Sequence, residues 1–418
     1  MKAFVCIPVA LAALLVLLAA PASTRAAPPR GEPGAADHDL LVLRAGTPAF
    51  GSLFAVPAGG HAVRWLPLGL FDRNGRTLYV ANPRGDGRSI VQAIDVPSGR
   101  LLRSMTVAGR FTTATADYAA ATLSFNGRWL ALRAATAAAD STRTIVIDTA
   151  AMRVVATLRL AGHFGLDAVD AAGKVLYLIE HLVGHGSVAY RVRSYELRTG
   201  RLDAHPVVEK GDTVGTMSGV ARTRAWSPDG DWLYTLYVHP GRAGAFIHAL
   251  GVEYHLAQCI DLPNVGATAA QLAHFTLAAA PDGSALYAVN PVLGLAVAVR
   301  GSPNALPFAT PQQVALGRRA GSPQRTFNGS AVSGDGRTLF VATGRGVWVI
   351  NSESLAVRAT YLAGRSVASV ALSRDGRRLY ALEAVHGVVD ALDPASGRIL
   401  HGLPTNTGAW AIEQVTSR

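Results

Sequence analysis

The stretch SRDGRRLY, residues 373–380, holds the pattern that decides the fold of this chain. An Asp-Gly turn stands between two apolar runs, and glycine supplies the positive φ that such a hairpin turn requires. The pattern of a tight Gly turn, a polar residue, Leu and an aromatic ring recurs in FDRNGRTLY (71–79), SPDGDWLY (227–234), PDGSALY (281–287) and SGDGRTLF (333–340). A recurring hairpin predicts a repeat protein made of strands.

The spacing of the copies sets the size of the repeat. With weaker copies included, the turn glycines lie at residues 75, 127, 173, 230, 283, 336 and 376, so the intervals are 52, 46, 57, 53, 53 and 40 residues. That is the period of a four-stranded propeller blade. A second signature, in IDVPSGR (94–100), YELRTGR (195–201) and LDPASGR (392–398), is predicted to join the third strand of a blade to the fourth. The fold class is therefore all-β, a single β-propeller.

The ends of the repeat region complete the ring. Residues 40–44, 52–56 and 63–66 resemble strands two, three and four of a blade without its first strand, and residues 408–415 resemble a first strand alone. Joined, they make one blade from both ends and leave no free sheet edge. We expect eight four-stranded blades over residues 39–418, about 47 residues per blade. Seven blades is the alternative, if the N-terminal strands pack outside the ring.

The first 38 residues have a different character. Lys2, the apolar run from Ala3 to Ala20 and the small residues up to Ala26 predict a secretory signal peptide at 1–26, followed by a flexible leader at 27–38. Cys6 precedes most of the apolar run, so a lipoprotein box is absent. A secreted or extracytoplasmic bacterial protein is expected, a monomer without stable membrane insertion once the signal is removed. A retained anchor is the alternative.

Composition narrows the class of protein. The chain has 418 residues, half of them apolar and 16% charged, so it can bury a large core and is not disordered. Two cysteines exclude a disulfide-stapled scaffold, and Cys259 is expected to be a buried apolar filler, with a free reactive thiol as the alternative. The formal charge of +11 raises the possibility of nucleic-acid binding. Scattered single arginines without a stacking platform argue against that partner.

A family resemblance rests on the residues after each turn. LYVAN (78–82), LYAVN (286–290), LFVAT (339–343) and LYALE (379–383), with the Asp-Gly turns before them, resemble the repeat of the YVTN family of β-propellers. The resemblance covers nearly all of the chain after the leader and implies an exported propeller. Surface-layer proteins, lactonases and lyases share this scaffold, so the resemblance implies architecture and does not choose an activity.

One set of candidate ligand-binding residues lies in the loops that enter the blades. In a propeller these loops share one face with the loops after each second strand, opposite the Gly turns. Arginine presents a planar fork that suits carboxylate or phosphate. A basic mouth for an anion is predicted from Arg110, His163, Arg318 and Arg365. The alternative is that these side chains cap loop carbonyls or lie solvated outside the mouth.

A second candidate set ends the second strands on the same face. Carboxylates and imidazoles can hold a divalent metal or act as acid and base. The residues are Glu180, His181, His239 and Glu383. The stretch EHLVGH (180–185) is not a metalloprotease helix, and polar residues at strand ends usually satisfy backbone groups. No metal, cofactor or catalytic residue is assigned from the sequence.

These patterns rank three functions. The first is a secreted binding or interaction module whose basic mouth takes an anionic small molecule or a protein partner. The second is a metal-dependent enzyme of the lactonase or lyase sort, which would use the carboxylates and imidazoles of the second set. The third is nonspecific binding of nucleic-acid phosphates. Whether the protein is an enzyme stays open at this point.

Overall fold

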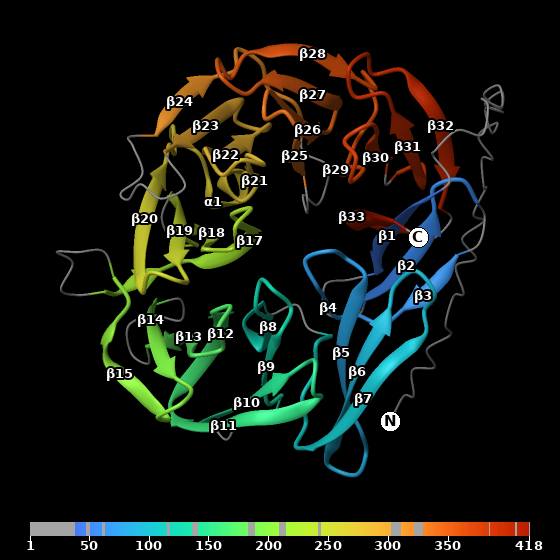
Figure 1. The fold of residues 1–418 in the computed structure, drawn as a ribbon. Helices are drawn as coiled ribbons and strands as arrows, with labels where there is room; N and C mark the ends of the chain where they lie inside the picture. The colour runs from blue at the N-terminus through green and yellow to red at the C-terminus, as the bar shows by residue number, and fades with distance from the viewer. Residues whose placement is uncertain are drawn as a thin grey trace, which may run out of the picture.

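The strands form eight antiparallel sheets arranged as blades around a ring (Figure 1). The computed structural model describes residues 38–46, 51–60, 63–114, 118–135, 141–182, 189–208, 215–240, 244–301, 311–321, 329–383, 385–405 and 408–417. The predicted signal peptide and all but the last residue of the leader lie outside these ranges. Among the described residues, no helix is long and apolar enough to span a bilayer. The prediction of an all-β propeller with eight blades is confirmed, and the seven-bladed alternative is wrong.

The blades are numbered here from the one that contains the first strand, and each is given from its inner strand outward. Blade 1 is β33 (Ala409–Ser417), β1 (Asp39–Gly46), β2 (Gly51–Pro57) and β3 (Arg64–Leu66); blade 2 is β4 (Leu70–Phe71), β5 (Thr77–Pro83), β6 (Arg88–Asp95) and β7 (Leu101–Ala108); blade 3 is β8 (Ala121–Leu123), β9 (Trp129–Arg133), β10 (Ser141–Asp148) and β11 (Arg153–Ala161); blade 4 is β12 (His163–Val169), β13 (Val175–His181), β14 (Ala189–Glu196) and β15 (Arg201–Pro206).

The second half of the ring repeats the same order. Blade 5 is β17 (Val220–Trp226), β18 (Trp232–Val238), β19 (Ala245–Gly251) and β20 (Leu256–Leu262); blade 6 is β21 (Thr276–Ala279), β22 (Ala285–Asn290), β23 (Leu295–Arg300) and β24 (Gln312–Ala315); blade 7 is β25 (Ser330–Val332), β26 (Thr338–Thr343), β27 (Gly346–Asn351) and β28 (Val357–Tyr361); blade 8 is β29 (Ser369–Leu372), β30 (Leu379–Glu383), β31 (Val388–Leu392) and β32 (Ile399–Pro404). A short strand, β16 (Met217–Ser218), pairs with β14, and one helical turn, α1 (Ala269–Leu272), precedes blade 6.

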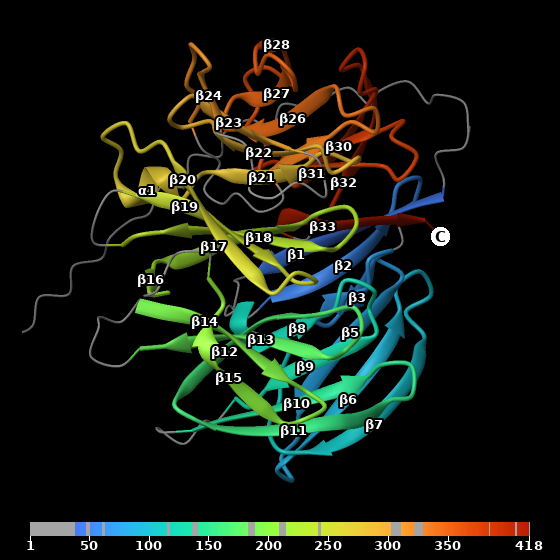
Figure 2. The same cartoon turned by 60° about the vertical axis from the view of Figure 1, so that its left-hand side comes forward.

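Blade 1 is shared between the two ends of the chain, as the sequence predicted. β33 lies beside β1 in both views (Figures 1 and 2), and Asp39 is the register partner of Ser417. A bulge on β33 leaves Glu413 without a register partner, and Arg44 of β1 donates to both of its carboxylate oxygens, at 2.7 and 3.1 Å. The Trp410 indole N–H donates to the Gly46 carbonyl at 2.8 Å. Side-chain contacts thus reinforce the backbone ladder that closes the ring.

The Gly turns define one face of the ring, which we call the turn face. Each of the seven turn glycines that the sequence identified has a positive φ, between +66° and +85°. At Gly230 a side chain is also excluded by packing, because a Cβ there would lie 1.9 Å from Cδ1 of Phe125. The opposite face, which we call the loop face, carries the loops after the second strands and the connections between blades. The predicted joints between third and fourth strands also turn where expected, as between β31 and β32.

Turns of different blades meet on the turn face. Arg73 of blade 2 donates to the carbonyl of Pro228 in blade 5 at 2.6 Å, and its guanidinium lies 4.5 Å from the ring centre of Phe125 in blade 3. Phe125 in turn lies 5.5 Å from the ring of Trp226. These contacts bridge three blades on one side of the ring.

Apolar side chains fill the space between neighbouring blades. Blades 5 and 6 share a cluster that includes Leu236, Ile247, Phe275 and Val297. Blades 8 and 1 share another, in which Tyr380 packs with residues of β1 and β2. Burying apolar surface in this way is the main favourable term in folding, at roughly 25 cal/mol per Å². The core is therefore a ring of interblade layers, and it holds the loops of the loop face in fixed positions.

Candidate functional site

All eight candidate residues lie on the loop face, distributed over five blades. Arg110 and Arg318 precede β8 and β25, and Arg365 precedes β29. The others begin or end strands, namely His163 at the start of β12, Glu180 and His181 at the end of β13, His239 just after β18 and Glu383 at the end of β30. Blades 3, 4, 5, 7 and 8 thus each contribute at least one candidate to one face.

The structure brings together only some of these residues. His163 and His181 are register partners on neighbouring strands of blade 4, and both are exposed. Arg365 contacts Glu383 in blade 8. Glu180 pairs with a residue that the sequence did not single out, since Arg193 of β14 donates to its Oε2 at 2.5 Å. His239 packs against the ring of Phe246, with the centroids 5.5 Å apart.

Arg365 is the centre of a buried acidic group. One guanidinium nitrogen, Nη1, lies 2.7 Å from Glu383 Oε1 and 3.0 Å from Asp390 Oδ2, and both carboxylates are buried. The other oxygen of Glu383 lies 2.9 Å from Nδ1 of the exposed His386. Burial alone would raise the pKa of Glu383, but hydrogen bonds with Asp390 and Arg365 and the charge of Arg365 hold that pKa below its ordinary value of 4.5. Arg365 therefore neutralises acids of its own blade.

Two other residues at the ends of second strands have structural roles. The Asn290 side chain donates to the Gln271 carbonyl at 2.8 Å and accepts backbone N–H groups from Val292 and Leu293. The Thr343 hydroxyl donates to the Gly346 carbonyl at 2.9 Å. Both side chains are buried and satisfy loop backbone, which is the common use of a polar residue at a strand end.

The remaining arginines of the first set have different surroundings. Arg110 and Arg318 are exposed, and the polar contact found for Arg318 is a long one, 3.4 Å to the Thr360 hydroxyl. Arg345, which follows β26 on the same face, is exposed as well. Exposed guanidinium groups at the mouth of a funnel attract anions and keep their donors available to a ligand.

Metal chemistry gains no support from the second set. In the ranges that the structure describes, no three residues among His, Cys, Asp and Glu are grouped so that they could hold one ion. Glu180, His239 and Glu383 belong to blades 4, 5 and 8, and Glu180 and Glu383 are each engaged by an arginine. The segments 183–188 and 241–243, next to His181 and His239, lie outside the described residues.

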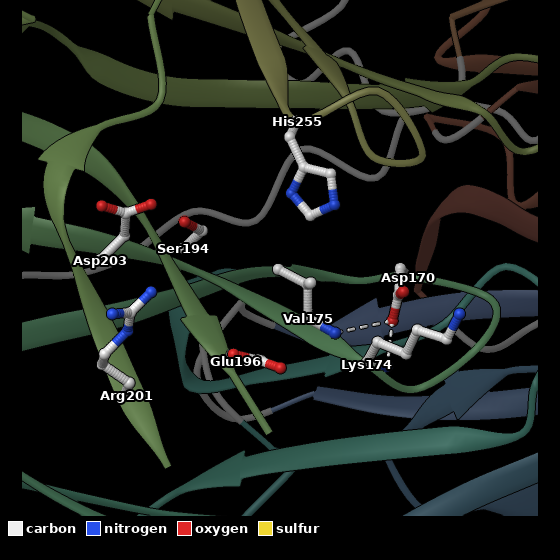
Figure 3. A pocket seen from close by; sticks show the side chains of 8 residues that line it. All are labelled: Asp170, Lys174, Val175, Ser194, Glu196, Arg201, Asp203 and His255. Carbon is white, nitrogen blue, oxygen red and sulfur yellow. Dashed lines mark hydrogen bonds between the residues drawn. The ribbon is translucent and has the colours of Figure 1, made fainter. Parts of the chain in front are cut away.

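A cavity that the sequence did not predict lies between blades 4 and 5, near the turn face. Its volume is about 330 Å³, at the small end of the range for ligand pockets. Figure 3 shows its charged lining, which comes from both blades and comprises Asp170, Lys174, Glu196, Arg201, Asp203 and His255. Asp170 already accepts the backbone N–H groups of Lys174 and Val175, at 2.7 and 3.0 Å. The remaining charged side chains of the lining carry both signs. The cavity therefore suits a zwitterionic ligand, or a surface that carries both charges, better than a simple anion.

The same junction contains a buried ion pair. Asp167 on the inner strand β12 accepts a hydrogen bond of 3.0 Å from Nη2 of Arg224 on β17. Asp167 is 1% exposed and Arg224 is 16% exposed. Next to them Tyr190 and Tyr237 stack, with ring centres 4.9 Å apart, and burial raises the pKa of both hydroxyls. The one sequence signal that could have indicated this ion pair was an aspartate inside the apolar run Phe164–Val169.

Fold and site together define an eight-bladed β-propeller with a polar loop face. The sequence matches no protein-family model and no curated protein. Among solved structures, apo AztD from Citrobacter koseri is similar over 91% of this chain and 98% of its own, with 11% identity and a TM-score of 0.56.

Two further structures share the propeller. Dihydro-heme d1 dehydrogenase NirN, in complex with DHE, is similar over 94% of this chain and 78% of its own, with 15% identity and a TM-score of 0.52. The Pseudomonas aeruginosa periplasmic gluconolactonase PpgL covers 82% of this chain and 98% of its own, with 15% identity and a TM-score of 0.42, too low to support an argument. At these identities the likeness concerns the fold alone.

Proposed function

We propose that this protein is an exported, YVTN-like propeller that binds an anionic ligand at its loop face. One observation carries the proposal. The acids that end second strands there have arginine partners, Arg193 for Glu180 and Arg365 for Glu383, whereas Arg110 and Arg318 are exposed. The paired acids do not compete for these two arginines. The ligand is a small carboxylate or phosphate, or an acidic surface of a partner protein.

Arg365 is not part of the proposed anion site, because it already balances two buried carboxylates. The proposed site therefore keeps the basic mouth expected from the sequence but excludes one of its arginines.

Replacing Arg110 and Arg318 together tests the proposal. The Arg110→Gln, Arg318→Gln variant should bind an anion at least about tenfold more weakly, because the loop face loses two positive charges that attract the anion. Wild type is first screened by thermal shift against di- and tricarboxylates, sugar phosphates and an acidic peptide, and affinities are then measured by calorimetry at two salt concentrations. The matched control is Arg198→Gln, Arg377→Gln, two exposed arginines on the turn face. Equal binding by both variants, or no anion bound by wild type, would refute the proposal.

Export is part of the same proposal and has its own test. Lys2 and the apolar run that follows it support a cleaved signal, with the mature chain beginning near Ala27. Protein recovered from outside the cytoplasm should give an N-terminal sequence that starts in the range 20–28. Recovery of the intact Met1 end in a membrane fraction would instead support the retained anchor.

A further inference from the structure

A second, smaller cavity lies at the outer part of the junction between blades 4 and 5. Its volume is about 70 Å³, enough for an ion or a few waters and too small for a metabolite. Met217, His248 and Cys259 line it together with apolar residues such as Val207 and Ala257. None of the three belongs to the proposed anion site on the loop face.

The topology explains why these three side chains meet. His248 on β19 and Cys259 on β20 are direct register partners, so their side chains leave the same side of the sheet. Met217 comes from blade 4, on the short strand β16 that pairs with β14. The Cys259 thiol sulfur lies 3.6 Å from the Met217 thioether sulfur and 4.0 Å from Nδ1 of His248. Two blades thus direct a thiol, a thioether and an imidazole at one small space.

These separations fit a shared metal ion. Metal–sulfur bonds of about 2.3 Å and metal–nitrogen bonds of about 2.0 Å place two sulfur ligands of a trigonal or tetrahedral site roughly 3.8 to 4.0 Å apart, and sulfur and nitrogen roughly 3.5 to 3.7 Å apart. The 3.6 Å sulfur–sulfur and 4.0 Å sulfur–nitrogen distances depart from these values by about 0.3 Å or less, which small side-chain rotations can supply. Cys259 is exposed, contrary to the expectation of a buried filler, and this gives an ion a path to the site.

His248 has the surroundings of a metal ligand. It is 1% exposed, and its second ring nitrogen, Nε2, has no hydrogen-bond partner among the described residues. The other ring nitrogen, Nδ1, faces the Cys259 thiol across 4.0 Å, so its lone pair can bind an ion placed between them.

The donor set and its charge select the ion. Thiolate and thioether ligands favour monovalent copper, whereas zinc rarely accepts a thioether. One thiolate with one Cu(I) gives a neutral centre, which costs least in a partly buried site, and a divalent ion would leave a positive charge there. We propose that Met217, His248 and Cys259 bind one Cu(I) ion at the junction of blades 4 and 5. Binding forms three metal–ligand bonds and releases the thiol proton to solvent, without a redox step.

Anaerobic titration of the full chain with Cu(I) tests this site, with a chromophoric Cu(I) chelator as the competing probe. Wild type should take one equivalent, and X-ray absorption should show two sulfur neighbours and one nitrogen neighbour. Met217→Leu should weaken binding at least about tenfold, and Cys259→Ser should abolish binding of that equivalent. The Met217 and Cys259 side chains both have access to solvent, so these two variants should keep the wild-type circular dichroism. A change at buried His248, by contrast, risks unfolding the protein.

A control variant separates the site from general thioether chemistry. Met105→Leu, on β7 in blade 2, should bind one equivalent as wild type does. The proposal is overturned if wild type takes up no Cu(I), if Cys259→Ser keeps the wild-type affinity, or if zinc displaces copper at equal concentration. Loss of copper in Met105→Leu would also overturn it, because the ion would then be held elsewhere.

Discussion

Arginine holds buried carboxylates at several places in the ring, and two of these places are built differently. In blade 8 the arginine, Arg365, and its partners Glu383 and Asp390 all belong to one blade and its entering loop. At the junction of blades 4 and 5 the pair is split, with Asp167 on β12 and Arg224 on β17. The first cluster stabilises a blade from within, and the second ties two blades together.

The surroundings of the two clusters differ as well. Both oxygens of Glu383 have partners, Arg365 and His386. By contrast, Asp167 Oδ2 and His248 Nε2 are buried without hydrogen-bond partners among the described residues, and both described cavities lie at the same junction. Unsatisfied buried polar atoms cost stability and are retained mostly where a ligand or a function uses them. Within the described part of the chain, the two cavities are what sets the junction of blades 4 and 5 apart from blade 8.

The largest effect is expected from Arg365→Gln. This change leaves two adjacent buried carboxylates without a counter-charge, and the loss should be about 3–5 kcal/mol at pH 7.5, measured by urea unfolding. In wild type the pKa of Glu383 is lowered, so its contribution to stability is present above pH 4.5 and is lost as pH falls through the folded-state pKa. In the variant that pKa rises, and the difference from wild type should shrink as pH falls toward 4.5.

A control and a contrary outcome make the Arg365 test specific. Arg377 is 79% exposed and 4.0 Å from Asp375, so Arg377→Gln should change stability by less than about 0.5 kcal/mol at either pH. A loss in Arg365→Gln that is small, or that stays constant between pH 7.5 and 4.5, would mean that the two carboxylates share a proton and need no arginine.

A smaller effect is expected from Arg224→Gln, because this change leaves one buried carboxylate without a counter-charge instead of two. The expected loss is about 2–3 kcal/mol, and cleavage by protease near the junction of blades 4 and 5 should increase. Arg44→Gln is the matched comparison, because Arg44 is equally exposed, at 16%, but its partner Glu413 is 12% exposed and can turn to water. The loss there should be about 1 kcal/mol. If Arg44→Gln costs more than Arg224→Gln, burial of the partner does not decide the ranking.

The sequence predicted the fold well because the decisive signals are local. Each Asp-Gly or Asn-Gly turn needs a glycine at positive φ, and that need is visible in a few residues, as at Gly376. The shared blade could be predicted because three strands at one end and one at the other add up to a complete sheet. The pairing of 39–46 with 409–417 followed from this arithmetic, although its register and the bulge at Glu413 did not.

The sites were predictable only in part, because they depend on contacts between blades. The repeat predicted that Arg365 and Glu383 lie on one face, but it did not predict that Asp390 joins them. No local pattern connects Asp167 with Arg224, which are 57 residues apart. Cys259 was expected to be buried because cysteines usually are, and it is exposed because it lies on the outer strand β20.

The shared blade has a consequence for how the gene could be rearranged. In the other seven blades a short glycine turn joins the first strand to the second, whereas in blade 1 the chain is interrupted between Ser417 and Asp39, which face each other across the ladder. A linker copied from SRDGRR would make this hairpin like the others. New ends could then be cut in another blade, since a circular permutant would retain every strand pairing.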